Sequence, residues 1–232
     1  ISGYGLIGAM CGYHPLVISA LGSDLLVDYR KHFIHRAQIE YAVDRADLIT
    51  VDSDSLAETA VEAGASCNNV IKVYFGIDSG IFYPPGPEKR KQKKQVRIIS
   101  TRNLYNIYNL DLLVEAAPRI LGGVDARFIL CGDGPERKRI EKRISELGLS
   151  DRFTLCGRIG ADKLADKLRE SDIYISTSSS DSTSVSLLEA MACGVFPVVT
   201  DLAGNREWIE DGVNGIIMES NDPEELAEKV IK

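Results

Sequence analysis

The sequence lacks long apolar runs. No stretch approaches the roughly 18 consecutive apolar residues of a membrane-spanning helix, which argues against a transmembrane segment. The first nine residues are apolar and glycine-rich, but neither basic residues nor an initiator methionine precede them. They therefore do not fit a secretory signal peptide, and we expect the chain to begin inside a longer protein.

The sequence also lacks an excess of basic residues and any cysteine pattern that fits a metal site. It has 27 Lys and Arg against 34 Asp and Glu, a net charge of −7, which argues against general nucleic-acid binding. The cysteines are odd in number and widely spaced, at Cys11, Cys67, Cys131, Cys156 and Cys193. This pattern is typical of reduced core thiols in a cytoplasmic protein and predicts no bound metal.

What the sequence does contain is an alternation of short apolar runs with helix-period segments, in a chain with 44% hydrophobic and 26% charged residues. The runs are continuously apolar, as in Phe128-Ile129-Leu130, which is typical of buried parallel strands. Strands are expected at Leu16–Ala20, Leu48–Val51, Val70–Tyr74, Arg97–Ser100, Arg127–Cys131, Phe153–Cys156, Ile173–Ser176, Pro197–Thr200 and Ile216–Met218. Helices are expected near Val27–Ala42, Leu56–Ala63, Leu110–Leu121, Arg137–Leu147, Lys163–Ser171 and Val185–Ala192, and from Glu224 onward. The alternation predicts an α/β fold of doubly wound parallel sheets.

One proline- and charge-rich stretch divides the chain. Pro84-Pro85-Gly86-Pro87 and the run that follows it predict an exposed linker over 84–95, between a first domain at 1–83 and a second at 96–232. The basic residues in 89–94 could instead contact an anionic membrane surface. Because the first domain has only two or three expected strands, where an open doubly wound domain normally has five or more, we expect it to be incomplete.

The segment Ser178–Gly194 carries the strongest chemical signal. It follows the strand Ile173–Ser176 and enters an apolar helix, so its loop lies at the carboxyl end of a parallel strand, where such sheets bind ligands. The backbone N–H groups of residues 184–186 would face a diphosphate there without a metal. Asp181 and Glu189 could grip sugar hydroxyls, because carboxylates only accept hydrogen bonds. Alternatively, Asp181 or Ser182 caps the helix, and Ser186 forms a capping box with Glu189.

Taken in order, the motifs resemble the retaining glycosyltransferases of the GT4 family, which have the GT-B fold. Two acidic residues separated by seven, the second opening Glu-Ala-Met-Ala-Cys-Gly, form that family's signature and stand here as Asp181 and Glu189–Gly194. Arg102 follows the first strand of the second domain, as in the family. Further matching segments are Leu21–Asp24, Gly76–Asp78, Phe82–Pro84, Cys131–Glu136, Gly157–Ile159, Phe196–Val199, Gly204–Ile209 and Asn214-Gly215.

The resemblance implies two Rossmann-like domains facing a cleft, with the acceptor on the first domain and the donor on the second. It implies transfer of a sugar from a UDP-, GDP- or ADP-sugar to a hydroxyl acceptor with retention of configuration. The acceptor would be a glycan, a lipid-linked sugar or a polyol, and neither a cofactor nor a metal is expected. Asp181 and Glu189 would be the catalytic carboxylates, Glu189 on the ribose and Asp181 on the donor sugar. The expected donor-binding residues are Gly22, Arg102, Gly132, Asp133, Gly157, Arg158, Ile159, Thr183, Ser184, Val185 and Glu189.

Several positions depart from the family pattern. Asp181 stands where Glu is usual, Ser182 and Ser184 stand where Gly is common, and Tyr108 stands where the family has a second phosphate-binding Lys. These departures keep open a non-catalytic protein that binds sugar nucleotides. With Tyr105 and Asn109, Tyr108 could instead form an alternative hydrogen-bonding set in a distinct subfamily.

Two other enzyme classes share features with this sequence. A nucleotide-sugar epimerase shares the fold but not the Glu189–Gly194 helix. A dehydrogenase would use Gly3-x-Gly5-x-x-Gly8, but no later motif fits one. The family's catalytic His is expected upstream of Ile1, and His14, His32 and His35 are poor substitutes. Trp208 is expected to pack rather than to stack on a sugar.

Overall fold

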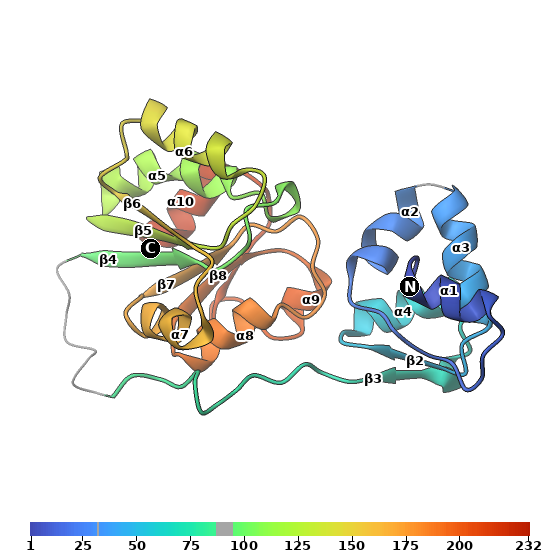
Figure 1. Cartoon of the computed structure of the whole chain (residues 1–232). Coiled ribbons are helices and arrows are strands. Elements are labelled where there is room, and N and C mark those ends of the chain that lie inside the picture. Colours follow the sequence, from blue (N-terminus) through green and yellow to red (C-terminus); the bar gives the residue numbers. More distant parts are fainter. Residues whose placement is uncertain (32, 87–94) are drawn as a thin grey trace. The chain divides into compact units, whose positions relative to one another are not determined.

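The computed structural model describes residues 1–31, 33–86 and 95–232, and these form two compact units (Figure 1). The first unit contains Ile1–Gly76, Ser180–Ser184 and Leu202–Trp208; the second contains Ile77–Ser179, Val185–Asp201 and Ile209–Lys232. The basic run 89–94 lies outside the described residues. No helix in the described part of the chain is long and apolar enough to cross a membrane.

The first unit is built on a three-stranded parallel sheet in the order β1-β2-β3. The strands are β1 (Val17–Ser19), β2 (Leu48–Val51) and β3 (Val70–Lys72). The helices are α1 (Tyr4–Met10), a π-helical turn at Asp24–Asp28, α2 (Tyr29–Lys31), α3 (Phe33–Asp44), α4 (Asp54–Glu62), a 3-10 turn at Cys67–Asn69 and α9 (Ala203–Arg206). Ile18 and Ile49 from the sheet are buried in one apolar cluster with Leu25, Ile39 and Leu56.

The glycines near the start of the chain have a packing role. A Cβ on Gly5 would lie 3.3 Å from the Ile18 side chain, and one on Gly8 would lie 2.9 Å from the Leu16 side chain. Both glycines belong to α1, so their small size lets this helix lie close to the Leu16–Ile18 segment. This packing accounts for the glycine spacing without a dinucleotide.

The second unit is a six-stranded parallel sheet in the order β6-β5-β4-β7-β8-β9. Its strands are β4 (Val96–Ser100), β5 (Ala126–Cys131), β6 (Phe153–Gly157), β7 (Ile173–Ser176), β8 (Phe196–Thr200) and β9 (Ile216–Met218). Its helices are a 3-10 turn at Asn106–Tyr108, α5 (Asp111–Gly123), α6 (Arg137–Glu146), α7 (Ala161–Arg169), α8 (Val185–Ala192) and α10 (Pro223–Ile231). Figure 1 shows α5, α6 and α10 on one face of the sheet and α7 and α8 on the other. The predicted α/β fold with parallel, helix-covered sheets is confirmed.

The core of the second unit follows from its continuous apolar strands. Phe128 of β5 is fully buried and stacks on Phe153 of β6 with the ring centroids 4.5 Å apart. Ile98 of β4 and Ile175 of β7 belong to the same cluster, which also contains Ile120 of α5. Both faces of these strands are covered, which is why the strands read as apolar runs rather than as alternating patterns.

Two local expectations were wrong. The helix expected over Val27–Ala42 is divided among the π-helical turn, α2 and α3, and α3 extends to Asp44. The cysteines are all free, but Cys11 and Cys67 are exposed and not core thiols. Each of these two cysteines lies in a turn next to glycine or polar residues, where an apolar neighbour on one side does not ensure burial.

Candidate functional site

The order of strands in the second unit defines where a ligand can bind. The chain runs outward from β4 through β5 to β6, then returns to β7 on the other side of β4 and continues to β8 and β9. The carboxyl ends of β4 and β7 therefore flank the switch point, where open parallel sheets hold their ligands. Arg102 lies two residues after β4, and Thr177 follows β7 directly.

Arg102 is brought to the start of helix α8. The residue is only 7% exposed, and its Nη1 donates to Ser186 Oγ at 3.5 Å, which links the end of β4 to the first turn of α8. Its guanidinium carbon lies 4.1 Å from the centroid of the Tyr108 ring. A guanidinium beside helix N–H groups, which lack partners within the helix, is a suitable place for phosphate.

Helix α8 also carries Glu189, about one turn from the helix start. Its side chain is half-buried, and burial raises the pKa of its carboxyl above the ordinary value. Because α8 begins at Val185, Ser186 is the second helical residue. The capping box of Ser186 and Glu189 is therefore wrong, since that motif needs its Ser or Thr before the helix. Glu189 is available to accept hydrogen bonds from a ligand.

The turn after β5 is packed against the segment that holds Arg102. Gly132 has φ +157°, and a Cβ there would lie 2.5 Å from the carbonyl oxygen of Arg102. A Cβ on Gly134 would lie 2.2 Å from the carbonyl oxygen of Leu104, while Leu104 N donates to Asp133 O at 3.1 Å. Only glycine permits this approach of two backbones, so the Gly132–Gly134 turn fixes the backbone that carries Arg102.

The loop after β6 joins the same group of strand ends. Gly132 N donates to Gly157 O at 3.0 Å, and Gly157 has φ +67°. Arg158 is exposed and Ile159 is half-buried. The structure thus groups Arg102, Gly132, Asp133 and Gly157 at the strand ends of the second unit.

The remaining predicted residues of the hydroxyl-rich loop belong to the first unit. Ser182 Oγ donates to Asp52 Oδ2 at 3.0 Å, and Thr183 Oγ1 donates to Asp52 O at 2.6 Å. Burial raises the pKa of Asp52. Gly22, with φ +126°, is close to the same loop, since a Cβ there would lie 3.2 Å from Ser182 Oγ. Sequence reasoning missed Asp52, which lies just past β2 and matches no motif.

The chain matches the family described as "Glycosyl transferases group 1" over residues 87–232, and "Glycosyl transferase 4-like" over residues 1–53. It belongs to the group 1 glycosyltransferase family.

Relatives of this group 1 chain are longer than it is. It is 28% identical over 224 residues to N-acetyl-alpha-D-glucosaminyl L-malate synthase of Bacillus anthracis, covering 94% of this chain and 56% of that protein. It is 26% identical over 191 residues to a phosphatidylinositol N-acetylglucosaminyltransferase of Arabidopsis thaliana, covering 82% of this chain and 41% of that protein. The chain thus spans about half the length of these relatives.

Solved structures agree on the fold of the group 1 chain. Anabaena HepE in complex with UDP-glucose has a TM-score of 0.83 at 22% identity, covering 99% of this chain and 66% of HepE. Sucrose-phosphate synthase from Thermosynechococcus elongatus has a TM-score of 0.83 at 19% identity, covering 97% and 61% of the two chains. The predicted GT-B fold is confirmed.

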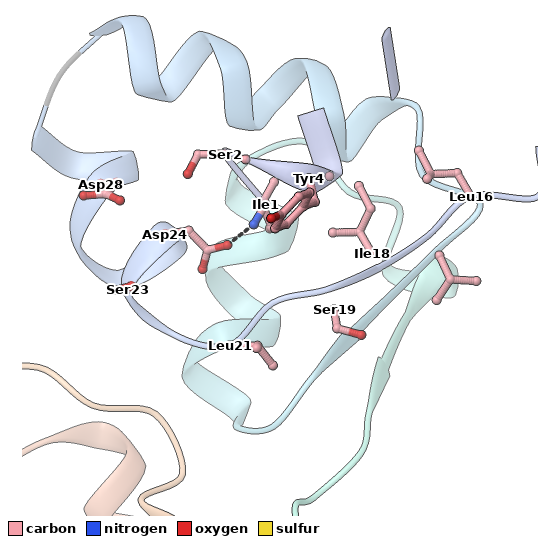
Figure 2. A pocket seen from close by; sticks show the side chains of 13 residues that line it. Ile1, Ser2, Tyr4, Leu16, Ile18, Ser19, Leu21, Ser23, Asp24 and Asp28 are labelled. Atoms are coloured by element: carbon pink, nitrogen blue, oxygen red, sulfur yellow. Dashed lines mark hydrogen bonds and ion pairs between the residues drawn. The ribbon is translucent and has the colours of Figure 1, made fainter. Parts of the chain in front are cut away.

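The group 1 chain has a separate cavity of about 480 Å³ within its first unit (Figure 2). Asp24 and Asp28 line it, and the Ile1 ammonium donates to Asp24. The predicted donor-binding residue Gly22 does not line it, although its neighbours Leu21 and Ser23 do.

Other candidates of the group 1 chain have structural partners. His14 Nδ1 lies 2.7 Å from Asp47 Oδ2, and His32 is outside the described residues. Trp208 packs edge-on against Tyr74 with the ring centroids 5.3 Å apart. In the described part of the chain, no three His, Cys, Asp or Glu side chains gather as they would around a metal ion.

Proposed function

We propose that this chain is the donor-binding part of an enzyme that transfers a sugar from a nucleotide diphosphate donor to a hydroxyl acceptor. The observation that carries the proposal is the contact of Arg102 with Ser186 in the first turn of α8, at the switch point of the second sheet. A cation and a helix start converge there, and together they neutralise a diphosphate.

The residue roles follow from chemistry and position. Arg102 forks onto the phosphate oxygens, and the backbone N–H groups of Thr183, Ser184 and Val185 add donors at the start of α8. Glu189 accepts hydrogen bonds from the ribose, and Asp181 accepts them from the donor sugar. Gly132 and Asp133 shape the turn beside Arg102, and Gly157, Arg158 and Ile159 hold the nucleobase. Gly22 leaves room for the donor beside the Ser182 loop.

The bond broken in the reaction joins the sugar to the diphosphate. The leaving diphosphate gains negative charge in the transition state, and preorganised donors aimed at that charge lower the barrier. Arg102 and the start of α8 supply this stabilisation, so we propose that transfer proceeds with retention of configuration and without a divalent metal.

The donor we propose is a UDP-sugar. Two relatives are named as N-acetylglucosaminyl enzymes, and HepE was solved with UDP-glucose. GDP- and ADP-sugars remain the comparison set. The acceptor class is a hydroxyl compound, with a glycan, a lipid-linked sugar and a polyol as candidates, and we place the reaction in the cytoplasm.

A second candidate function is sugar-nucleotide binding without transfer. It is motivated by Tyr108, which leaves Arg102 as the cation at this site, and by the shorter carboxylate of Asp181. This candidate predicts nucleotide binding with no turnover of the UDP-sugar when acceptors are supplied.

Calorimetric titration with UDP, GDP and ADP, with and without EDTA, tests the proposal. We expect one nucleotide to bind, with an affinity that EDTA does not change. Glu189→Ala should weaken that nucleotide by about 1.5–3 kcal/mol for each charge-assisted hydrogen bond lost. No binding of any of the three by the folded chain would refute the donor site.

Arg102→Ala provides a second arm, with Arg169→Ala as its matched control. Arg169 also stacks on a tyrosine, with its guanidinium carbon 4.5 Å from the Tyr83 ring centroid. We expect Arg102→Ala to weaken UDP far more than uridine and Arg169→Ala to weaken neither. Equal losses for UDP and uridine in Arg102→Ala would make Arg102 a structural residue.

A further inference from the structure

The segment after β4 contains an aromatic residue in contact with Arg102. The guanidinium carbon of Arg102 lies 4.1 Å from the Tyr108 ring centroid. The Tyr105 ring meets the Tyr108 ring edge-on, at 6.5 Å between centroids and an interplanar angle of 83°. Arg102 is therefore in contact with an aromatic face that a second ring supports.

The backbone that carries Tyr108 is fixed by the residues after β7. Thr177 Oγ1 lies 2.9 Å from both the Tyr108 and the Asn109 carbonyl oxygens, which accept its hydrogen bond. Ser179 donates to the Ile107 carbonyl oxygen through its backbone N at 2.8 Å and its Oγ at 3.0 Å. Asn109 then turns the chain with φ +45°. These bonds hold the Tyr108 ring at one place relative to the switch point.

The Arg102 side chain is thus held at two places. The Tyr108 ring is stacked with its guanidinium, and Ser186 Oγ in the first turn of α8 accepts from its Nη1. A free arginine side chain samples many rotamers, and fixing it before a ligand arrives lowers the entropy cost of binding. The stacking leaves the edge of the planar guanidinium, where its N–H groups point, for an oxyanion.

We propose that Tyr108 is a positioning residue that holds the Arg102 guanidinium in the orientation that binds the diphosphate. This role rests on the proposed function, since it concerns the same donor site. It acts through the aromatic face and not through the phenol hydroxyl. Tyr108 therefore sets affinity for the diphosphate and leaves affinity for the nucleoside unchanged.

The test is a set of variants of the full chain, titrated with UDP and with uridine. Tyr108→Leu should weaken UDP by roughly fivefold to thirtyfold, the range expected for a partly desolvated cation–π contact, and leave uridine unchanged. Tyr108→Phe keeps the ring and should retain wild-type UDP affinity. Tyr83→Leu removes the similar contact with Arg169 and should change neither ligand.

A double-mutant cycle separates positioning from a general structural effect. In the Arg102→Ala background, Tyr108→Leu should cause no further loss of UDP affinity, because the residue it positions is gone. Additive losses, or a loss in Tyr108→Phe equal to that in Tyr108→Leu, would overturn the proposal.

The two levels of inference fail in different ways. Wild-type chain that binds no nucleoside diphosphate would refute the proposed function itself. Wild-type chain that binds UDP, with the same affinity in Tyr108→Leu, would refute the positioning role alone.

Discussion

Gly132→Ala tests whether the turn after β5 fixes the Arg102 backbone. The added Cβ would lie 2.5 Å from the Arg102 carbonyl oxygen, 3.0 Å from Asn103 Cα and 3.1 Å from the Arg102 carbonyl carbon. The nearest atoms are all backbone, so no flexible side chain can move aside. The φ of +157° at Gly132 also lies where residues with a Cβ are strained.

The magnitude can be worked from these two effects. Overpacking costs about 1–3 kcal/mol, and a sparsely allowed backbone conformation costs about 1–3 kcal/mol, so we expect a loss of roughly 2–6 kcal/mol in the free energy of unfolding. For a chain of this size each kcal/mol lowers Tm by about 2–4 °C. Because any relaxation shifts Arg102, UDP affinity should fall more than uridine affinity.

Differential scanning calorimetry measures the first effect and isothermal titration the second. Gly122→Ala is the matched control, because Gly122 lies in α5 with nothing within 4 Å of its added Cβ. Alanine in a helix is favoured over glycine by about 0.5–1 kcal/mol, so this variant should be unchanged or more stable. A Gly132→Ala protein with wild-type Tm and wild-type UDP affinity would refute the reasoning.

Three further predictions concern charge, packing and thiols. Since the pKa of Glu189 is raised in the folded state, the folded protein loses stability as pH rises through that pKa. Glu189→Gln should therefore stabilise the chain at about pH 8 and not at about pH 4 in urea unfolding; an equal difference at both pH values would contradict this. Phe128→Ala removes a fully buried ring and should cost about 3–5 kcal/mol in the same assay, whereas a loss below about 1 kcal/mol would mean that the core closes around the gap. Burial and the neighbouring Cys156 raise the pKa of Cys131 to about 12, so maleimide at neutral pH should label exposed Cys11 first, as read by mass spectrometry of the native chain; equal labelling of the two thiols would refute this.

The strands could be predicted from the sequence because burial on both faces leaves a plain signal. Leu48–Val51, Ile173–Ser176 and Ile216–Met218 have the predicted bounds, and the other strands differ by one or two residues at an end. The short helical turns could not be predicted. Asn106–Tyr108 and Ala203–Arg206 are too short to show a helical period.

The candidate site could be predicted in part. Arg102 and Glu189 were identifiable because motif and residue chemistry agree. The place of Tyr108 was less evident: the expected hydrogen-bonding set of Tyr105, Tyr108 and Asn109 did not include stacking on Arg102. Whether an aromatic ring contacts a cation depends on contacts between segments, here the bonds from Thr177 to residues 108 and 109. No local pattern contains them.

The switch-point topology has a consequence for protein engineering. Arg102 and its hydrogen-bond partner Ser186 are 84 positions apart, and they meet only because β4 and β7 pair in the sheet. A chain divided at Gly160, before α7, would place the arginine on one piece and the helix on the other. Nucleotide binding would then report reassembly of the two pieces, which makes this sheet a basis for a split sensor whose output is ligand capture.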